Sequence, residues 1–269
     1  MDFNVKEFNV RLRTIKLRDL ALGILLSCII MIMLMIFFPI LSKNDDLFFI
    51  VFLTVILLFF IFALRKSTGI EENLKNLFSP SIRKEIFYVF AINMAFAFIF
   101  TCVLSWADLF IGLYDPSWVS MFDIDSVDIS AGAFIISAIG SIFYAPLIEE
   151  LVFRGVLFNR LKIRIGIIPA MIISSLLFGI GHDFGGITSA FLFGICMCIL
   201  YLKTDNIFVP MSVHFINNVV AVFFELIQLD SIICQFPLLI LTTVIVVISM
   251  ILIIKYIVQE ISALNMKFS

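Results

Sequence analysis

Apolar segments of roughly 20 residues recur along this chain, and their length constrains its fold more than any other feature. A helix needs about 20 mainly apolar residues to cross a bilayer. Because lipid cannot form hydrogen bonds with the backbone, the N–H and C=O groups of a spanning segment must bond to one another. The composition agrees, because 62% of the 269 residues are hydrophobic and the mean hydropathy is +1.18. Soluble domains are about half apolar. The sequence therefore predicts an all-α, polytopic membrane protein whose surroundings are a lipid bilayer.

We expect about eight transmembrane helices, and the Lys and Arg residues test this number. The expected spans are 21–42, 47–64, 86–106, 131–153, 166–184, 187–202, 207–227 and 233–254. Short cytoplasmic loops are enriched in basic residues. With the N-terminus inside, 17 of the 18 Lys and Arg residues lie on the inner side and only Lys43 lies outside. One span more or fewer would invert the later loops, so we predict a cell-membrane protein with both termini cytoplasmic.

The charge and the placement of polar residues predict the partners and the organisation of the chain. The net charge is −2 and no segment forms a basic domain, so we expect no nucleic-acid partner. Unusual polar residues are confined to 131–227. We therefore expect N-terminal membrane helices with their loops in 1–130, a catalytic membrane core in 131–227 and a C-terminal membrane helix in 228–269.

Two glutamates and an arginine close the fourth apolar segment, in the run Glu149–Arg154. Ionisable residues are costly in lipid and usually mark a functional site. Glu150 and Arg154 are four residues apart, so they share a helix face and can pair as an ion pair that braces the helix. Adjacent residues point about 100° apart, which leaves Glu149 free to face a cavity. There a carboxylate can serve as general base or acid.

The two histidines of the chain lie in later apolar spans, and each belongs to a four-residue step. His214 and Asn218 share one face of the seventh span, where both can donate hydrogen bonds to a single point, as an oxyanion hole requires. His182 follows Phe178 by one turn, and the phenyl ring can form a wall of the pocket. On straight helices His182 and His214 would differ in depth by roughly 10 Å. Either the fifth span starts deeper, or the spans around it tilt or stop short.

Three motifs in this order resemble the CPBP family, the CAAX-protease and bacteriocin-processing group that is also called Abi. They are E-E-x-x-x-R at 149–154, F-x-x-x-H at 178–182 and H-x-x-x-N at 214–218. All motif positions match, and the resemblance covers residues 140–225. The family includes the type II CAAX prenyl endopeptidases, so the resemblance implies an intramembrane endopeptidase acting on a membrane-associated peptide or protein.

The resemblance also implies roles for single residues and leaves the need for a metal open. Glu149, helped by His182, would activate the attacking water, while His214 and Asn218 would stabilise the oxyanion. Alternatively Glu149, His182 and His214 would be the three protein ligands of an open zinc site. The chain lacks H-E-x-x-H, the familiar helical zinc motif, and zinc would occupy its one obvious base. We therefore favour the glutamate mechanism without a cofactor.

Other classes of function are weighed against this hypothesis. A non-enzymatic immunity or scaffold protein of the same fold would not need intact motifs. A transporter would be expected to repeat its polar residues in both halves, whereas here they are confined to one. A serine enzyme would rely on Ser141, which lacks the G-x-S-G context, and an aspartyl enzyme would need two aspartates in the membrane. The frequent Ile, Phe, Asn and Lys suggest an AT-rich bacterial genome. Because prenylation of CAAX proteins is not expected in bacteria, a bacteriocin or signalling-peptide precursor is the expected kind of substrate.

Overall fold

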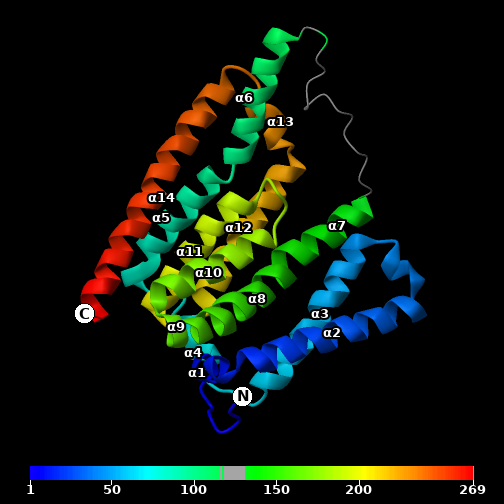
Figure 1. Cartoon of the computed structure of the whole chain (residues 1–269), viewed down its shortest axis with the longest axis vertical. Coiled ribbons are helices and arrows are strands. Elements are labelled where there is room, and N and C mark those ends of the chain that lie inside the picture. The colour runs from blue at the N-terminus through cyan, green and yellow to red at the C-terminus, as the bar shows by residue number, and fades with distance from the viewer. Residues whose placement is uncertain (116, 118–130, 269) are drawn as a thin grey trace.

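The computed structural model describes residues 1–115, 117 and 131–268, with side chains as far as residue 264. Figure 1 shows that the described regular elements are helices, and only a single β-bridge joins Glu7 to Thr68. The first half contains α1 (Phe8–Thr14), α2 (Leu17–Phe37), a 3-10 turn (Pro39–Ser42), α3 (Asp45–Leu64), α4 (Ile70–Lys75), α5 (Pro80–Phe96) and α6 (Ile99–Tyr114). The second half contains α7 (Ala131–Ile139), α8 (Ala145–Glu150), α9 (Asn159–Ile165), α10 (Ile167–Ile180), α11 (Ile187–Thr204), α12 (Phe208–Leu226), α13 (Leu229–Ile233) and α14 (Leu238–Phe268).

Seven helices of the described residues are long and apolar enough to cross a membrane, which confirms the predicted all-α polytopic fold. They are Leu17–Phe37, Asp45–Leu64, Pro80–Tyr114, Ala131–Ile165, Ile187–Thr204, Phe208–Leu226 and Leu238–Leu264. The fifth predicted span is the exception. Its helix α10 has 14 residues, about 21 Å of helix, and His182 lies in the turn that follows. The helix therefore stops short, which is one of the two explanations offered for the mismatch in depth.

The fourth predicted span differs from expectation at its inner end. The helix continues without a break from Ala131 to Ile165, so the Glu149–Arg154 run lies in its middle, and the expectation that this run closes the segment is wrong. The physical reason is that Arg154 is buried and paired with Glu150 rather than marking the exit to water. Gly166 ends the helix instead, with φ of +87°, a backbone conformation that glycine adopts without a steric penalty.

This long helix contains two π-helical segments, Gly140–Tyr144 and Leu151–Phe158, on either side of α8. A π turn disrupts the regular i→i−4 hydrogen-bonding pattern, and asparagine side chains bond to both segments. Asn218 of α12 donates to the Ser141 carbonyl at 2.7 Å. Asn159 donates to two carbonyls of the second segment, each at 2.9 Å. Asparagine side chains thus bond to the backbone of both π segments. The two segments lie on either side of α8, which carries Glu149 and Glu150.

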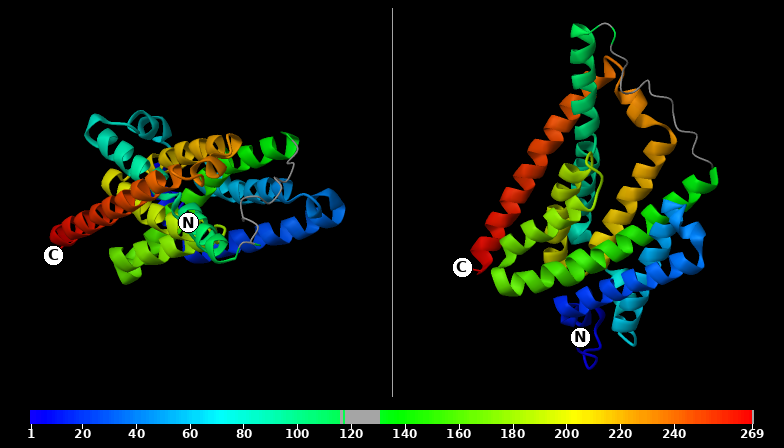
Figure 2. Two further views of the ribbon diagram at one scale, coloured as in Figure 1. Left: turned by 90° about the horizontal axis from the view of Figure 1, so that it is seen from above. Right: turned by 45° about the vertical axis from the view of Figure 1, so that its right-hand side comes forward.

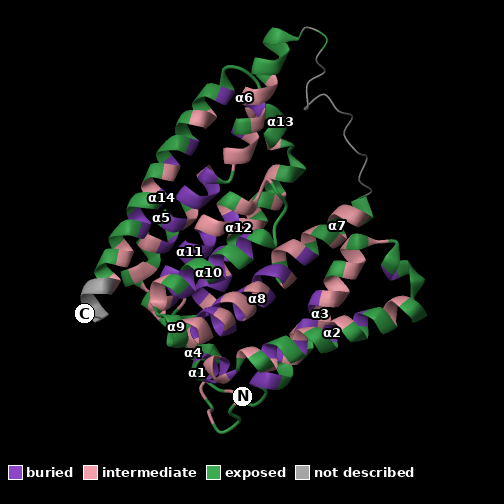
Figure 3. Cartoon of the chain, in the orientation of Figure 1, coloured by how far each residue is buried: buried purple, intermediate pink, exposed green. Residues whose placement is uncertain are grey.

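The core is centred on α11, the most buried of the seven candidate spans. Figure 3 shows the buried residues concentrated on the inner helices, whereas α2, α3 and α14 expose large parts of their surfaces. Small residues let helices approach closely. A Cβ at Gly194 would lie 2.9 Å from the Ser175 Cβ and 3.1 Å from the Arg154 guanidinium. Helix α11 can therefore pack directly against α10 and the glutamate-bearing helix.

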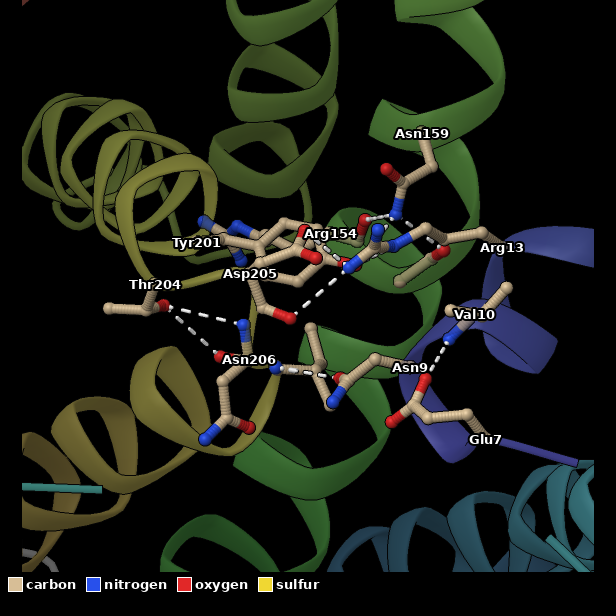
Figure 4. A network of polar contacts seen from close by, with 12 residues as sticks. Glu7, Asn9, Val10, Arg13, Arg154, Asn159, Tyr201, Thr204, Asp205 and Asn206 are labelled. Carbon is tan, nitrogen blue, oxygen red and sulfur yellow. Dashed lines mark hydrogen bonds and ion pairs between the residues drawn. The ribbon is translucent and has the colours of Figure 1, made fainter. Parts of the chain in front are cut away.

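Both termini lie at the lower end of the molecule in Figure 1, with α1, α4 and α9, and the second view of Figure 2 agrees. Polar contacts connect the segments that gather there, as Figure 4 shows for part of the network. Arg13 of α1 donates to the Tyr201 hydroxyl at 3.1 Å and pairs with Asp205. Lys203 bonds to Glu85 and Glu260. Segments predicted to be cytoplasmic therefore meet at one end of the fold, while their orientation in a membrane stays a prediction.

Candidate active site

The adjacent glutamates of α8 lie in different surroundings, as their spacing predicts. The Glu150 Oε1 and Arg154 Nη1 atoms are 2.8 Å apart, and both side chains are fully buried. The predicted ion pair is therefore confirmed. The Arg154 guanidinium also lies over the Phe178 ring, 4.3 Å from its centroid. Glu149 points away from this pair and keeps 24% of its side chain exposed.

His214 lies between the two glutamates. Its Nδ1 atom is 3.0 Å from Glu150 Oε1, and because an ionised carboxylate only accepts, we infer that this ring nitrogen carries a proton. Its Nε2 atom lies 3.8 Å from Glu149 Oε2, beyond hydrogen-bonding distance. The rings of Phe178 and Phe193 enclose the imidazole at centroid distances of 5.7 and 5.2 Å. Glu150 therefore does more than neutralise Arg154, since it also fixes the orientation of His214.

His182 lies just beyond the end of α10, in an exposed turn. Its Nδ1 atom is 2.9 Å from the Phe178 carbonyl oxygen. A carbonyl can only accept, so Nδ1 is the donor and Nε2 is left for other partners. The imidazole packs on the Phe178 ring at a centroid distance of 4.7 Å. The predicted wall residue thus contacts both histidines and the arginine.

Four side chains from the three motifs line a single cavity of about 410 Å³: Glu149, His182, His214 and Asn218. They come from α8, the turn after α10, and α12. A second cavity of about 230 Å³ shares His182, His214 and Asn218 and extends towards α5 and α11. Residues that lie far apart in the sequence are thus brought together at the junction of two cavities. Their catalytic roles stay predictions.

The cavities also contain residues that the motifs do not indicate. Ser141, Asp183 and Glu225 line the larger cavity, and Phe193 lines the smaller one. Glu225 follows Asn218 by seven residues, two helical turns on the same face, so continuing the His214–Asn218 pattern along the helix could have found it. Ser141 and Phe193 carry no comparable signal, because a serine or a phenylalanine in an apolar helix is ordinary.

The placement of Glu149, His182 and His214 bears on the alternative zinc site. Within the described part of the chain, no group of three His, Cys, Asp or Glu side chains lies close enough together to hold a metal ion. Glu149, His182 and His214 line the same cavity without converging on one point, so the arrangement does not fit a zinc site.

Comparisons with known proteins bear on the same part of the chain. Residues 131–220 match the model of a family described as Rce1-like, type II CAAX prenyl endopeptidase. The predicted family resemblance is therefore confirmed over these residues. MroQ of Staphylococcus aureus (strain USA300), a membrane-embedded CAAX protease, is 35% identical over 105 residues, which are 36% of this chain and 40% of MroQ. YdiL of Bacillus subtilis (strain 168), a candidate membrane peptidase, is 33% identical over 82 residues, which are 30% of this chain and 34% of YdiL.

The similarity covers less than half the length of each of these relatives. The match to the family model includes all three motifs, because its residues 131–220 contain the whole of 149–218. No solved structure matches the chain.

Proposed function

We propose that this chain is an intramembrane endopeptidase, which hydrolyses a peptide bond in a membrane-associated peptide or protein. The observation that carries the proposal is the meeting of Glu149, His182, His214 and Asn218 at one cavity between apolar helices. A carboxylate, two imidazoles and an amide supply a base, a water-positioning group and oxyanion donors. The similarity to type II CAAX prenyl endopeptidases supports the reaction class.

Glu149 is the proposed general base. It takes a proton from a water molecule while the water oxygen attacks the carbonyl carbon of the scissile bond. As the tetrahedral intermediate collapses and the C–N bond breaks, Glu149 returns this proton to the leaving amine. His182, whose Nδ1–H is engaged by the Phe178 carbonyl, would hold the water through Nε2. Peptide hydrolysis is then balanced without any further reactant.

His214 and Asn218 are the proposed oxyanion donors. Asn218 uses one amide hydrogen on the Ser141 carbonyl, which fixes its side chain and leaves the second hydrogen for the oxyanion. His214 already donates through Nδ1 to Glu150, so it can also donate through Nε2 only when the ring is doubly protonated. The Glu150 carboxylate accepts from Nδ1 and so holds the ring in place at the wall of the cavity.

Comparative peptidomics of cell membranes tests the function directly. Cells with the unaltered chain and cells with Glu149→Ala would be compared. A peptide cut in the first and accumulating intact in the second is expected. The expected class of substrate is a bacteriocin or signalling-peptide precursor. Equal peptide profiles, with resistance to a peptide toxin unaffected by the variant, would instead support the non-enzymatic immunity or scaffold alternative.

Chelation tests the metal-free mechanism. With Glu149 as base, purified enzyme should keep its activity after exhaustive treatment with a chelator and should contain less than one zinc ion per chain. If chelation abolishes hydrolysis and stoichiometric zinc restores it, the glutamate mechanism is wrong. Glu149, His182 and His214 would then be ligands of an open zinc site, with Asn218 the principal oxyanion donor.

A further inference from the structure

The smaller cavity, of about 230 Å³, has no role in the proposed mechanism. It shares His182, His214 and Asn218 with the larger cavity, whereas Glu149 lines the larger one alone. Its volume is below the roughly 300–1,000 Å³ that is typical of pockets for whole small ligands, yet it is several times the volume of a water molecule. The smaller cavity therefore has a size that suits one side chain of a longer substrate.

The wall of the smaller cavity combines small residues with polar residues that carry no permanent charge. Ala97, Gly186, Ala190 and Ala221 leave the space open because they have little or no side chain to fill it. Among the described residues, no lysine, arginine, aspartate or glutamate lines it. A charged side chain that entered would lose its water without gaining a permanently charged partner, which is costly. The wall therefore favours a neutral side chain.

Asn93 of α5 adds a buried hydrogen-bond acceptor to this wall. Its side chain lines the cavity, and the residue is only 5% exposed. The Nδ2 atom donates to the Val89 carbonyl at 2.8 Å, which fixes the orientation of the amide. Within the described part of the chain, the Oδ1 atom has no hydrogen-bonding partner. Buried polar atoms are nearly always satisfied in native proteins, and a donor carried by a ligand would supply the missing partner.

Asn217 of α12 lines the same cavity, and its side chain forms no hydrogen bond with the described residues. Its amide can both donate and accept. The two asparagines thus present an acceptor from α5 and a second amide from α12. A carboxamide matches both, because it carries two N–H donors and a carbonyl acceptor. A carboxylate only accepts, and an aliphatic side chain would leave both asparagines without a partner.

We propose that the smaller cavity binds a glutamine or asparagine side chain of the substrate, at one of the two residues that the scissile bond joins. This inference rests on the proposed function. His214 and Asn218, the proposed donors to the scissile carbonyl, also line the smaller cavity. The side chain that enters it therefore belongs to a residue next to that carbonyl. Asn93 selects this side chain through its Oδ1 atom and takes no part in the chemical step.

Binding of matched peptides to the full chain in detergent micelles tests the selection without requiring hydrolysis. The probes are fluorescent peptides with a common apolar sequence and a single Gln, Met or Glu, which are similar in size, at successive positions. Affinities are measured by anisotropy in the Glu149→Gln background, and mass spectrometry with the unaltered chain locates the cleaved bond. At one position, next to that bond, we expect Gln to bind roughly 10- to 100-fold more tightly than Met or Glu. The difference between Gln and Met should not depend on salt, because neither side chain is charged.

An apolar replacement of similar size distinguishes a lost preference from a misfolded protein. Asn93→Leu removes the unpartnered acceptor, so it should raise the affinity for the Met peptide and bring the ratio of Gln-peptide to Met-peptide affinity to one or below. A gain of binding for the Met peptide cannot come from unfolding. Asn217→Leu should weaken the preference for Gln in the same direction. Asn76→Leu is the matched control, since Asn76 is exposed after α4 and does not line the cavity, and the preference should persist.

The inference and the proposed function can fail separately. Equal affinities for the Gln, Met and Glu peptides at every position, or a preference for Gln that Asn93→Leu leaves unchanged, would overturn the selection even if Glu149-dependent cleavage is observed. Tighter binding of Met than of Gln by the Glu149→Gln chain would show an apolar pocket and overturn it as well. A strong preference for Gln that Asn93→Leu removes, without cleavage of any peptide by the unaltered chain, would support the carboxamide pocket and contradict the endopeptidase.

Discussion

At the scale of single residues, the difference between Glu149 and Glu150 arises from their angular positions on one helix. The ring of His214 is placed between them, with Nδ1 on the buried glutamate and Nε2 towards the cavity. Among the described residues, the Nε and Nη2 atoms of Arg154 and the Oε2 atom of Glu150 have no hydrogen-bonding partner. Buried polar atoms without partners lower the free energy of unfolding. Substitutions at Glu150 or Arg154 should therefore affect stability strongly.

The first prediction concerns this pair of glutamates. Glu149→Gln should abolish hydrolysis without loss of stability, because the amide keeps the shape of the side chain but cannot accept the proton of water. Glu150→Gln should instead lower the free energy of unfolding by about 3–5 kcal/mol, the usual effect of leaving a buried charge such as Arg154 alone, and should also misorient His214. Thermal unfolding in detergent and a peptide-cleavage assay measure both. Equal stability of the two variants with equal loss of activity would contradict this division of roles.

The second prediction concerns the oxyanion donor Asn218. Asn218→Ala should reduce kcat by about 100- to 1000-fold, the typical cost of removing one donor to an oxyanion. KM should change much less, because the charge exists only in the transition state. Asn76→Ala provides a control, since it removes the same group at an exposed position after α4, outside both cavities, and should leave kcat unchanged. A large rise in KM with kcat preserved would assign Asn218 to substrate binding instead.

At the scale of elements, the π segments connect the glutamates to the rest of the fold. Asn218 bonds into the first segment and Asn159 into the second, and Asn159 also bonds to the Tyr201 hydroxyl at 3.0 Å. Because Arg13 of α1 reaches the same hydroxyl, the N-terminal helix is linked to the helix that carries the proposed base. A Cβ on Gly155 would lie 2.8 Å from the Leu12 side chain, so α1 also packs closely here.

The third prediction follows from this link. Asn159→Ala removes a donor from two backbone carbonyls and from Tyr201, and it should destabilise the fold by about 1–3 kcal/mol, the range for buried polar groups left unsatisfied. Activity should fall with it, because the second π segment begins directly after Glu150. Asn76→Ala, at an exposed position after α4, should leave the unfolding temperature unchanged. Unfolding followed by fluorescence in detergent compares them, and equal temperatures for both variants would refute the role of Asn159.

At the scale of the whole molecule, the polar contacts place the N-terminal segment, the α4 region, the α11–α12 turn and the end of α14 together. The asymmetry of Lys and Arg predicts the same grouping from the sequence, with all of these segments inside. Seven long helices alone would leave the two ends of the chain on opposite sides. In the predicted topology the short helix α10 would supply the additional crossing that returns the chain, so the position of the C-terminus stays a prediction.

The fourth prediction is this topology. In a chain with its five cysteines replaced by alanine, Lys43→Cys should react with a membrane-impermeant maleimide on intact cells. Lys75→Cys, equally accessible to water on α4, should react only after the membrane is permeabilised. Labelling of residue 75 from outside would show that the orientation, and with it the prediction of cytoplasmic termini, is wrong.

The sequence by itself determined the membrane class, most helix positions, the Glu150–Arg154 pair and the identity of the polar residues that meet at the cavity. These features follow from short-range physics, because lipid demands long apolar helices and helical periodicity decides which neighbours share a face. The family resemblance was equally readable, since its motifs lie within single helices.

Only the tertiary structure decided how the three motifs meet. The hydrogen bond from His214 to Glu150, the anchoring of Asn218 on Ser141, and the placement of Asp183 and Glu225 in the cavity all join separate elements. Helical periodicity fixes the face on which a side chain lies, but it does not fix the rotation, depth or partner of that helix. Packing sets these, through close contacts such as Gly194 against Ser175, and through the shortness of α10, which places His182 beside the cavity.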